Sequence, residues 1–346
     1  MGTQLEVSSS DIVVTGDRPT GPLHLGHFVG SLTTRLGLQE RCRQFILIAD
    51  LQALTDNAGA PGRVAEHVLE VALDYLAVGI DPGRSTIALQ SGIPELAELT
   101  ILLLNLVTVA RLERNPTIRD EIRQRGFERD IPAGFLMYPV SQAADIAGFR
   151  ATVVPVGADQ LPMIEQSNEL VRAVNRLAQR DILVEARPLL SATQRLPGLD
   201  GKSKMSKSLG NTIDLTVSSE ELRERVKRMF TDPGHLRVDD PGTVEGNAVF
   251  AYLDAFDPEP AEVATLKARY RQGGLADSAL KQRLTGVLET LLAPIRARRA
   301  DLAGRRREVA DIIDAGTEVA RRQVAEVLGD VREAFRLRRE RGRVGP

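Results

Sequence analysis

Residues 11–27, DIVVTGDRPTGPLHLGH, are the stretch that decides the fold. The apolar run 11–16 has the length of a buried strand, the loop after it is rich in glycine and proline, and residues 28–39 have the pattern of a helix. Gly21 and Gly26 remove side chains from the loop, so a ligand can approach its backbone. Because the first N–H groups of a helix are unpaired and lie at the positive end of its dipole, this arrangement predicts a phosphate site.

Further apolar runs of strand length alternate with helical patterns. The predicted strands are 44–50, 85–90 and 151–157, and the predicted helices are 62–78, about 97–112 and 159–177. Strands that alternate with helices indicate a parallel sheet with helices on both faces. The sequence therefore predicts an α/β fold with a Rossmann-like parallel-sheet domain.

The pattern changes after residue 212. Ser218 and Glu221 have the spacing of a capping box for a helix that runs to about residue 230. Further helices are predicted at 246–256, 259–271, 277–302 and 305–340, with no convincing strand among them. We expect two domains: 1–212, which is Rossmann-like, and 213–346, which is all-helical.

Composition and charge exclude several classes of protein. The single cysteine, Cys42, excludes a disulfide framework and a multi-cysteine metal site. We see no secretory signal, and the most apolar stretch, 99–112, is too short to span a bilayer, so we expect a cytoplasmic enzyme. Residues 291–346 hold 14 Arg and 9 acidic residues, which is +5 in a chain of net charge −2. That positive part suits a polyphosphate partner, although it also fits a solvated helix surface.

Two histidines stand together in HLGH, His24 and His27. Their imidazoles can donate hydrogen bonds to phosphate oxygens without the flexibility of longer side chains. A helix-capping pair and half of a metal site are the alternatives. The metal site is disfavoured because no cysteine is near and the other histidines, His67 and His235, belong to unrelated segments.

A second motif, KMSKS, occupies residues 204–208 in a loop of small and polar residues. The chain has only six lysines, and three of them are Lys202, Lys204 and Lys207. Such clustering indicates a need for compact ammonium groups at this place. Gly201-Lys202-Ser203 looks like the end of a P-loop, but Leu196 stands where that motif needs its first glycine, so we exclude a P-loop.

HLGH and KMSKS in this order resemble the signature of class I aminoacyl-tRNA synthetases. Small nucleotidyltransferases also carry the first motif, but they usually lack a helical domain after the second. The segments 16–32, 137–146, 153–165 and 195–211 are similar to the tryptophanyl branch of the family. The tyrosyl branch is the nearest alternative, and an auxiliary paralogue with a secondary or regulatory role is another.

The resemblance implies a reaction and a set of partners. We expect the enzyme to activate L-tryptophan with ATP and Mg²⁺, and to transfer it to tRNA(Trp). The helical domain would bind the anticodon, and neither DNA nor a membrane would be a partner. The family forms homodimers, and the leucine-rich helix near 97–112 would be core, with part of it in the dimer interface.

The family's functional residues fall on definite positions of this sequence. The catalytic groups would be His24, His27, Lys204 and Lys207. The ATP-binding residues would be Arg18, Thr20, Gly26, His27, Gly157, Asp159, Lys204, Met205, Ser206 and Lys207. The tryptophan-binding residues would be Val14, Ala49, Gln52, Tyr138, Gln142, Asp145, Ile146, Val154, Val156 and Gln160. No protein ligand for a metal is expected, because ATP would hold most of the Mg²⁺ coordination.

Asp145 would be the residue that senses the indole. An indole has one polar atom, an N–H donor, so one buried acceptor recognises it. Phenylalanine would leave this acceptor unpaired, which discriminates strongly. A helix-terminal or salt-bridged aspartate is the alternative.

Four residues depart from the family's pattern. Gln52 and Gln142 stand where other members have histidine and methionine, Ala158 where glutamate is common, and Arg18 where some have glutamine. The pocket is therefore expected to be more polar and to tolerate a substituted indole.

Overall fold

The computed structural model describes residues 7–127, 130–190, 196–201, 205 and 209–337. Its centre is a sheet of five parallel strands in the order β3-β2-β1-β4-β5. The strands are β1 (Ile12–Asp17), β2 (Arg43–Ile48), β3 (Ser85–Leu89), β4 (Val153–Val156) and β5 (Arg187–Leu190). The four predicted strands are present, and the predicted α/β class is confirmed. The sequence analysis missed β5, a short edge strand that contains Pro188 and no fully buried residue.

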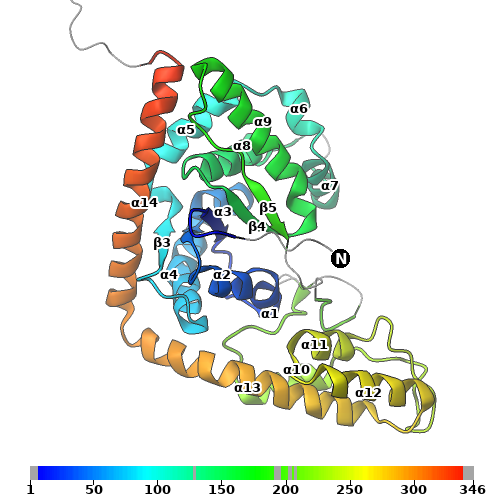
Figure 1. The fold of residues 1–346 in the computed structure, drawn as a ribbon. Helices are drawn as coiled ribbons and strands as arrows, with labels where there is room; N and C mark the ends of the chain where they lie inside the picture. The colour runs from blue at the N-terminus through cyan, green and yellow to red at the C-terminus, as the bar shows by residue number, and fades with distance from the viewer. Residues whose placement is uncertain (1–6, 128–129, 191–195, 202–204, 206–208, 338–346) are drawn as a thin grey trace, which may run out of the picture.

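Alternate residues of β2 face two different layers of helices, as a strand buried on both sides requires. Ile46 and Ile48 pack in one apolar cluster with residues of α4 (Pro61–Val78). Phe45 and Leu47 pack in another, with residues of α8 (Ala133–Ala147), α9 (Leu161–Ala178) and the C-terminal helix. Figure 1 shows these helices around the sheet.

The helix predicted at 28–39 begins earlier than expected. It consists of α1 (Leu25–His27), a π-helical turn (Phe28–Leu32) and α2 (Thr33–Leu38). The helix predicted near 97–112 is two helices, α5 (Pro94–Leu104) and α6 (Val109–Glu113). The sequence analysis did not predict α3 (Asp50–Asn57), α7 (Pro116–Arg125) or α8. No helix in the described part of the chain is long and apolar enough to cross a membrane.

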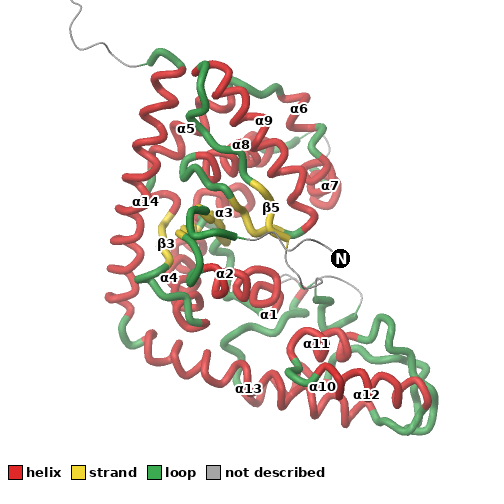
Figure 2. The backbone as a smooth tube through the Cα atoms, in the orientation of Figure 1, coloured by secondary structure: helices red, strands yellow, loops and turns green. Residues whose placement is uncertain are grey.

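The five helices predicted after residue 212 are present. They are α10 (Ser219–Lys227), α11 (Ala248–Phe256), α12 (Pro260–Gln272), α13 (Asp277–Ala303) and α14 (Arg306–Ala334). Ser218 caps α10, because its hydroxyl accepts a hydrogen bond from the Glu221 N–H at 3.1 Å. Figures 1 and 2 show α10–α12 at one end of the molecule, joined to the rest by the long helix α13.

The last helix, α14, returns to the sheet and lies along β3 and α5 (Figure 1). It approaches β3 so closely that a Cβ atom on Gly316 would lie 2.0 Å from the carbonyl oxygen of Ile87. Only glycine fits at that position. The division of the chain at residue 212 stays a prediction, but the second part includes a helix that packs on the first.

A buried ion pair joins α13 to α4 and to the loop before HLGH. Arg299 Nε donates to Asp74 Oδ1 at 2.6 Å, and Asp74 Oδ2 accepts from the Leu23 N–H at 2.8 Å. Asp74 is fully buried, and burial raises its pKa despite these two hydrogen bonds. Asp74 thus holds the residue before His24 and depends on Arg299 for its charge balance.

We expect Arg299→Met to lower the free energy of unfolding by about 3 kcal/mol, because it leaves the Asp74 carboxylate buried without its cation. Urea unfolding measures this. Arg305→Met is the matched control, since the pairs that Arg305 makes with Asp301 and Glu308 are exposed. This substitution should cost less than about 1 kcal/mol of unfolding free energy. Equal losses of unfolding free energy in the two variants would contradict the role of Arg299 in balancing the charge of Asp74.

Candidate active site

The two histidines of HLGH form a capping box at the start of α1. His24 Nδ1 accepts from the Gly26 N–H at 3.1 Å, and His27 Nδ1 accepts from the His24 N–H at 3.2 Å. A ring nitrogen that accepts a hydrogen bond carries no proton, so the proton of each neutral imidazole lies on Nε2. The capping alternative is therefore correct for Nδ1 of each ring. Because Nδ1 accepts a hydrogen bond, the neutral ring is in the tautomer in which Nε2 is a donor.

The chain that follows KMSKS pairs with HLGH. The Leu25 N–H donates to the carbonyl of Ile213 at 2.9 Å, and the Leu215 N–H donates to the carbonyl of Leu23 at 2.9 Å. The bridge between His24 and Asp214 lies between these bonds. Two segments almost two hundred residues apart are thus held side by side.

Met205, the residue of KMSKS that the structure describes, lies against the first motif. A Cβ on Gly26 would lie 3.0 Å from Met205 Sδ and 2.8 Å from His24 Cε1, so the contact needs glycine. Met205 is buried in the main apolar cluster. The other predicted residues of this motif, Lys204, Ser206 and Lys207, lie outside the described residues.

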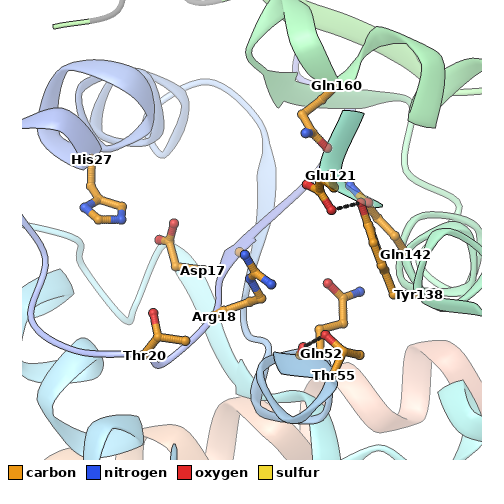
Figure 3. A pocket seen from close by; sticks show the side chains of 11 residues that line it. Asp17, Arg18, Thr20, His27, Gln52, Thr55, Glu121, Tyr138, Gln142 and Gln160 are labelled. Atoms are coloured by element: carbon orange, nitrogen blue, oxygen red, sulfur yellow. Dashed lines mark hydrogen bonds between the residues drawn. The ribbon is translucent and has the colours of Figure 1, made fainter. Parts of the chain in front are cut away.

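A polar cavity of about 320 Å³ opens beside His27 at the carboxyl end of β1. Figure 3 shows His27, Thr20, Arg18, Tyr138 and Gln160 around it. Its lining also includes the predicted residues Gln52 and Gln142. The carboxyl ends of parallel strands are the usual place for ligands in an open α/β sheet.

A second cavity, of about 290 Å³, adjoins the first and shares Arg18, Gln52, Gln142 and Gln160 with it. Its lining includes the predicted apolar residues Val14, Ala49, Ile146, Val154 and Val156, together with Gly157 and Asp145. Nine of the ten residues that were predicted to bind tryptophan thus line this cavity. The tenth, Tyr138, lines the polar cavity.

A third cavity, of about 460 Å³, lies between α7 and the start of α9. Arg18 lines all three cavities, and Ala158 and Asp159 line this one. The backbone carbonyl of Asp159 accepts from the Thr117 hydroxyl at 2.8 Å, which ties α7 to the predicted ATP ribose segment.

Asp145 is 6% exposed and lies at the wall of the second cavity. Gln52 Nε2 donates to its Oδ2 at 2.7 Å, and Gln90 Nε2 lies 2.9 Å from Oδ1 and 2.8 Å from Oδ2. Burial raises the pKa of Asp145 to about 7; the Gln90 hydrogen bond opposes this shift, and Asp50 adds to it. Asp145 lies in the last turn of α8, as the helix-terminal alternative requires. Its side-chain hydrogen bonds within the described residues are with amides, so the salt-bridged alternative does not describe them.

The sequence analysis missed Asp17 and Glu121. Asp17 Oδ2 accepts from Arg35 at 2.6 Å and from the Tyr75 hydroxyl at 2.8 Å. Burial alone would raise its pKa, but the Arg35 charge and these hydrogen bonds lower it to about 2. The sequence did offer one signal for Asp17, because this residue comes directly after the predicted strand 11–16, where ligands of a parallel sheet bind. Glu121 accepts from the Tyr138 hydroxyl at 2.9 Å, and nothing in the sequence of α7 pointed to this (Figure 3).

The raised pKa of Asp145 predicts a pH dependence of stability. The folded protein holds a proton on Asp145 up to about pH 7, whereas the unfolded chain loses it near pH 3.8, so this group's contribution to stability falls as pH rises between those values. Asp145→Asn removes the effect. We expect the variant to gain more than about 1 kcal/mol in unfolding free energy relative to wild type between pH 5 and pH 8. If the unfolding free energies of wild type and Asp145→Asn, measured with urea, change in parallel with pH, the raised pKa of Asp145 is contradicted.

Comparison with known proteins gives a consistent result. The sequence model described as tRNA synthetases class I (W and Y) matches residues 8–293. A tryptophan–tRNA ligase of Clostridium longisporum is 54% identical over 331 residues, which cover 94% of this chain and 97% of that protein. A tryptophan–tRNA ligase of Streptococcus pneumoniae is 53% identical over 333 residues, 94% of this chain and 98% of the other.

A solved structure agrees with these sequence matches. The tryptophanyl-tRNA synthetase of Campylobacter jejuni, complexed with ADP and tryptophan, superimposes with a TM-score of 0.81 at 28% identity, over 94% of this chain and 99% of that one. Both motifs, and the segments 23–25 and 213–215 that pair with each other, fall inside the residues 8–293 that the family model matches. The chain therefore belongs to the class I tRNA synthetases of the tryptophan and tyrosine family.

Proposed function

We propose that this chain activates L-tryptophan with ATP to tryptophanyl-adenylate and pyrophosphate, and then transfers the amino acid to tRNA(Trp). The observation that carries the proposal is the position of Asp145, a buried acceptor at the wall of an apolar cavity beside the HLGH loop. The relatives at 53–54% identity favour tryptophan over the tyrosyl alternative.

The hydrogen bonds of Asp145 suit an indole. An ionised carboxylate has about four acceptor positions. The contacts with Gln52 and Gln90 use three of them, which leaves about one. An indole offers one N–H and nothing else, whereas a phenol offers a hydroxyl that also needs a donor when it is buried. A single remaining acceptor therefore favours tryptophan over both tyrosine and phenylalanine.

In the first step, the tryptophan carboxylate attacks the α-phosphorus of ATP, so no protein nucleophile is needed. Catalysis then depends on positioning and on stabilising developing charge. The Nε2–H groups of His24 and His27 are the donors for the phosphates, and Gly26, which has no side chain, lets the phosphates come close to the loop. Lys204 and Lys207 neutralise the leaving pyrophosphate, which breaks away from the α-phosphorus as the new bond forms.

Mg²⁺ is expected to be held mainly by the ATP phosphates. The carboxylates in the polar cavity already have partners, because Asp17 accepts from Arg35 and Tyr75, and Glu121 accepts from Tyr138. The groups of HLGH are donors, which suit anions. A cation that is carried by the nucleotide is compatible with these partnered carboxylates and these donors. It would neutralise charge on the phosphates.

The second step would transfer the aminoacyl group to the 2′-hydroxyl of the terminal adenosine, as class I membership implies. The helical region after residue 212 would bind the anticodon, with arginines on phosphates. A cytoplasmic homodimer is part of the proposal. Ile101 of α5 and Val109 of α6, which are 60% and 59% exposed, suit a subunit interface there.

The direct test of the proposed function is ATP–pyrophosphate exchange with each of the twenty amino acids, followed by charging of tRNA(Trp). We expect tryptophan alone to support fast exchange, and transfer to tRNA(Trp) to follow. Faster exchange with tyrosine would favour the alternative branch, and no exchange with any amino acid would exclude adenylation. The expected tolerance for a substituted indole is checked in the same assay with ring-substituted tryptophans.

Lys207→Ala should lower the rate of adenylate formation by about a hundredfold, with little change in tryptophan affinity, because the ammonium acts on charge that develops in the transition state. Single-turnover kinetics separate the rate from the affinity. Lys227→Ala, in α10, is the control lysine. Equal losses of affinity and rate in Lys207→Ala would mean that Lys207 binds the ground state instead.

A further inference from the structure

Gln90 is a buried amide at the carboxyl end of β3. It is 1% exposed, and its Nε2 is 2.9 and 2.8 Å from the two oxygens of Asp145. Its Oε1 accepts from the backbone N–H of Gln52 at 3.2 Å. Among the described residues, Asp145 and Gln52 line the apolar cavity and Gln90 does not. Gln90 therefore contacts the two polar residues that would face the indole, from outside the cavity.

The C-terminal helix fixes the backbone on both sides of Gln90. The Leu89 N–H donates to Thr317 Oγ1 at 2.9 Å, and the same hydroxyl donates to the carbonyl of Ile313 at 2.7 Å. On the other side, a Cβ on Gly92 would lie 2.5 Å from Thr317 Cγ2. Thr317 thus serves as an acceptor for the residue before Gln90 and packs against the residue two positions after it.

We propose that Gln90 is a positioning residue for tryptophan selection, and that Thr317 of α14 holds Gln90 in place, so that the C-terminal helix takes part in choosing the amino acid. This inference rests on the proposed function, since it names the residues that orient the acceptor for the indole. Gln90 acts through Asp145 and touches neither substrate.

The physical basis is the state of the Asp145 carboxylate. A buried carboxyl group favours its neutral form, which has a hydroxyl donor where an indole N–H needs an acceptor. The Gln90 amide donates to both oxygens and favours the ionised form, and it also sets the plane of the group. Asp50, from α3, is the ionisable group that acts against this by its negative charge. Tryptophan binding should therefore strengthen as pH rises through the pKa of Asp145, which is about 7 in the free protein.

The test uses Gln90→Met, which keeps the length of the side chain and removes the amide. We expect the KM for tryptophan in pyrophosphate exchange to rise about tenfold at pH 7, because a hydrogen bond to a charged group contributes at least this factor. The kcat should change less than threefold. The pH midpoint of the KM profile should move up by about one unit, because the amide lowers the pKa of Asp145. The preference for tryptophan over phenylalanine should fall.

Gln166→Met is the matched control. Gln166 is also 1% exposed, but it accepts from Asn115 at 2.7 Å, and the part of the chain that the structure describes has no hydrogen bond between Gln166 and Asp145. This variant should leave the pH midpoint and the preference over phenylalanine unchanged. An unchanged KM and midpoint in Gln90→Met, or the same shift in Gln166→Met, would overturn the proposal.

Thr317 provides a second, independent variant in case Gln90→Met does not fold. Thr317→Val keeps the shape and removes the acceptor of the Leu89 N–H, so the KM should rise and its pH midpoint move in the same direction as in Gln90→Met. Thr317→Ser keeps the hydroxyl and should behave as wild type. If Thr317→Val has the wild-type KM and pH midpoint, α14 takes no part in the selection of tryptophan. Wild-type protein without tryptophan-dependent exchange would refute the proposed function instead, so the two failures are distinguishable.

Discussion

Two backbone hydrogen bonds between residues 23–25 and 213–215 are the constraint on which the site depends. They place the segment after KMSKS against the HLGH loop, and Met205 packs where only a glycine at position 26 leaves room. The loop in turn is held by Asp74, whose charge is balanced by Arg299 of α13. The proposed phosphate cradle, built from two distant motifs, would need such a scaffold, because donors aimed at developing charge must be fixed before the reaction begins.

The balance of donors and acceptors around Asp145 links the fold to selectivity. Burial favours the neutral form of this carboxyl group, and the Gln90 amide opposes that tendency. Gln52 also donates to the group, and the proposed function uses the remaining acceptor for the indole. One of these amides is held by β3, and β3 is covered by α14. The C-terminal helix therefore contacts the backbone on both sides of Gln90, which itself contacts Asp145 at the wall of the apolar cavity.

The sequence predicted the fold where local pattern determines structure, and it failed where tertiary contacts do. The four apolar strands and the helices after residue 212 follow from periodicity and caps. Neither β5 nor the docking of α14 on β3 has such a signal, since one is a short edge strand with a proline and the other depends on a close approach at Gly316. In the site, motif and resemblance pointed to the cavity residues that the structure brings together. Gln90, Asp17 and Glu121 were missed because their roles come from partners distant in sequence.

In the proposed reaction, HLGH and KMSKS act on one triphosphate as a single unit. A double-mutant cycle on the rate of tryptophanyl-adenylate formation, with His27→Ala, Lys207→Ala and the double variant, tests it most directly. Groups that act as a unit give strongly non-additive losses, so the double variant should be no more than about tenfold slower than the slower single variant. A double variant whose loss equals the product of the two single losses would contradict the account.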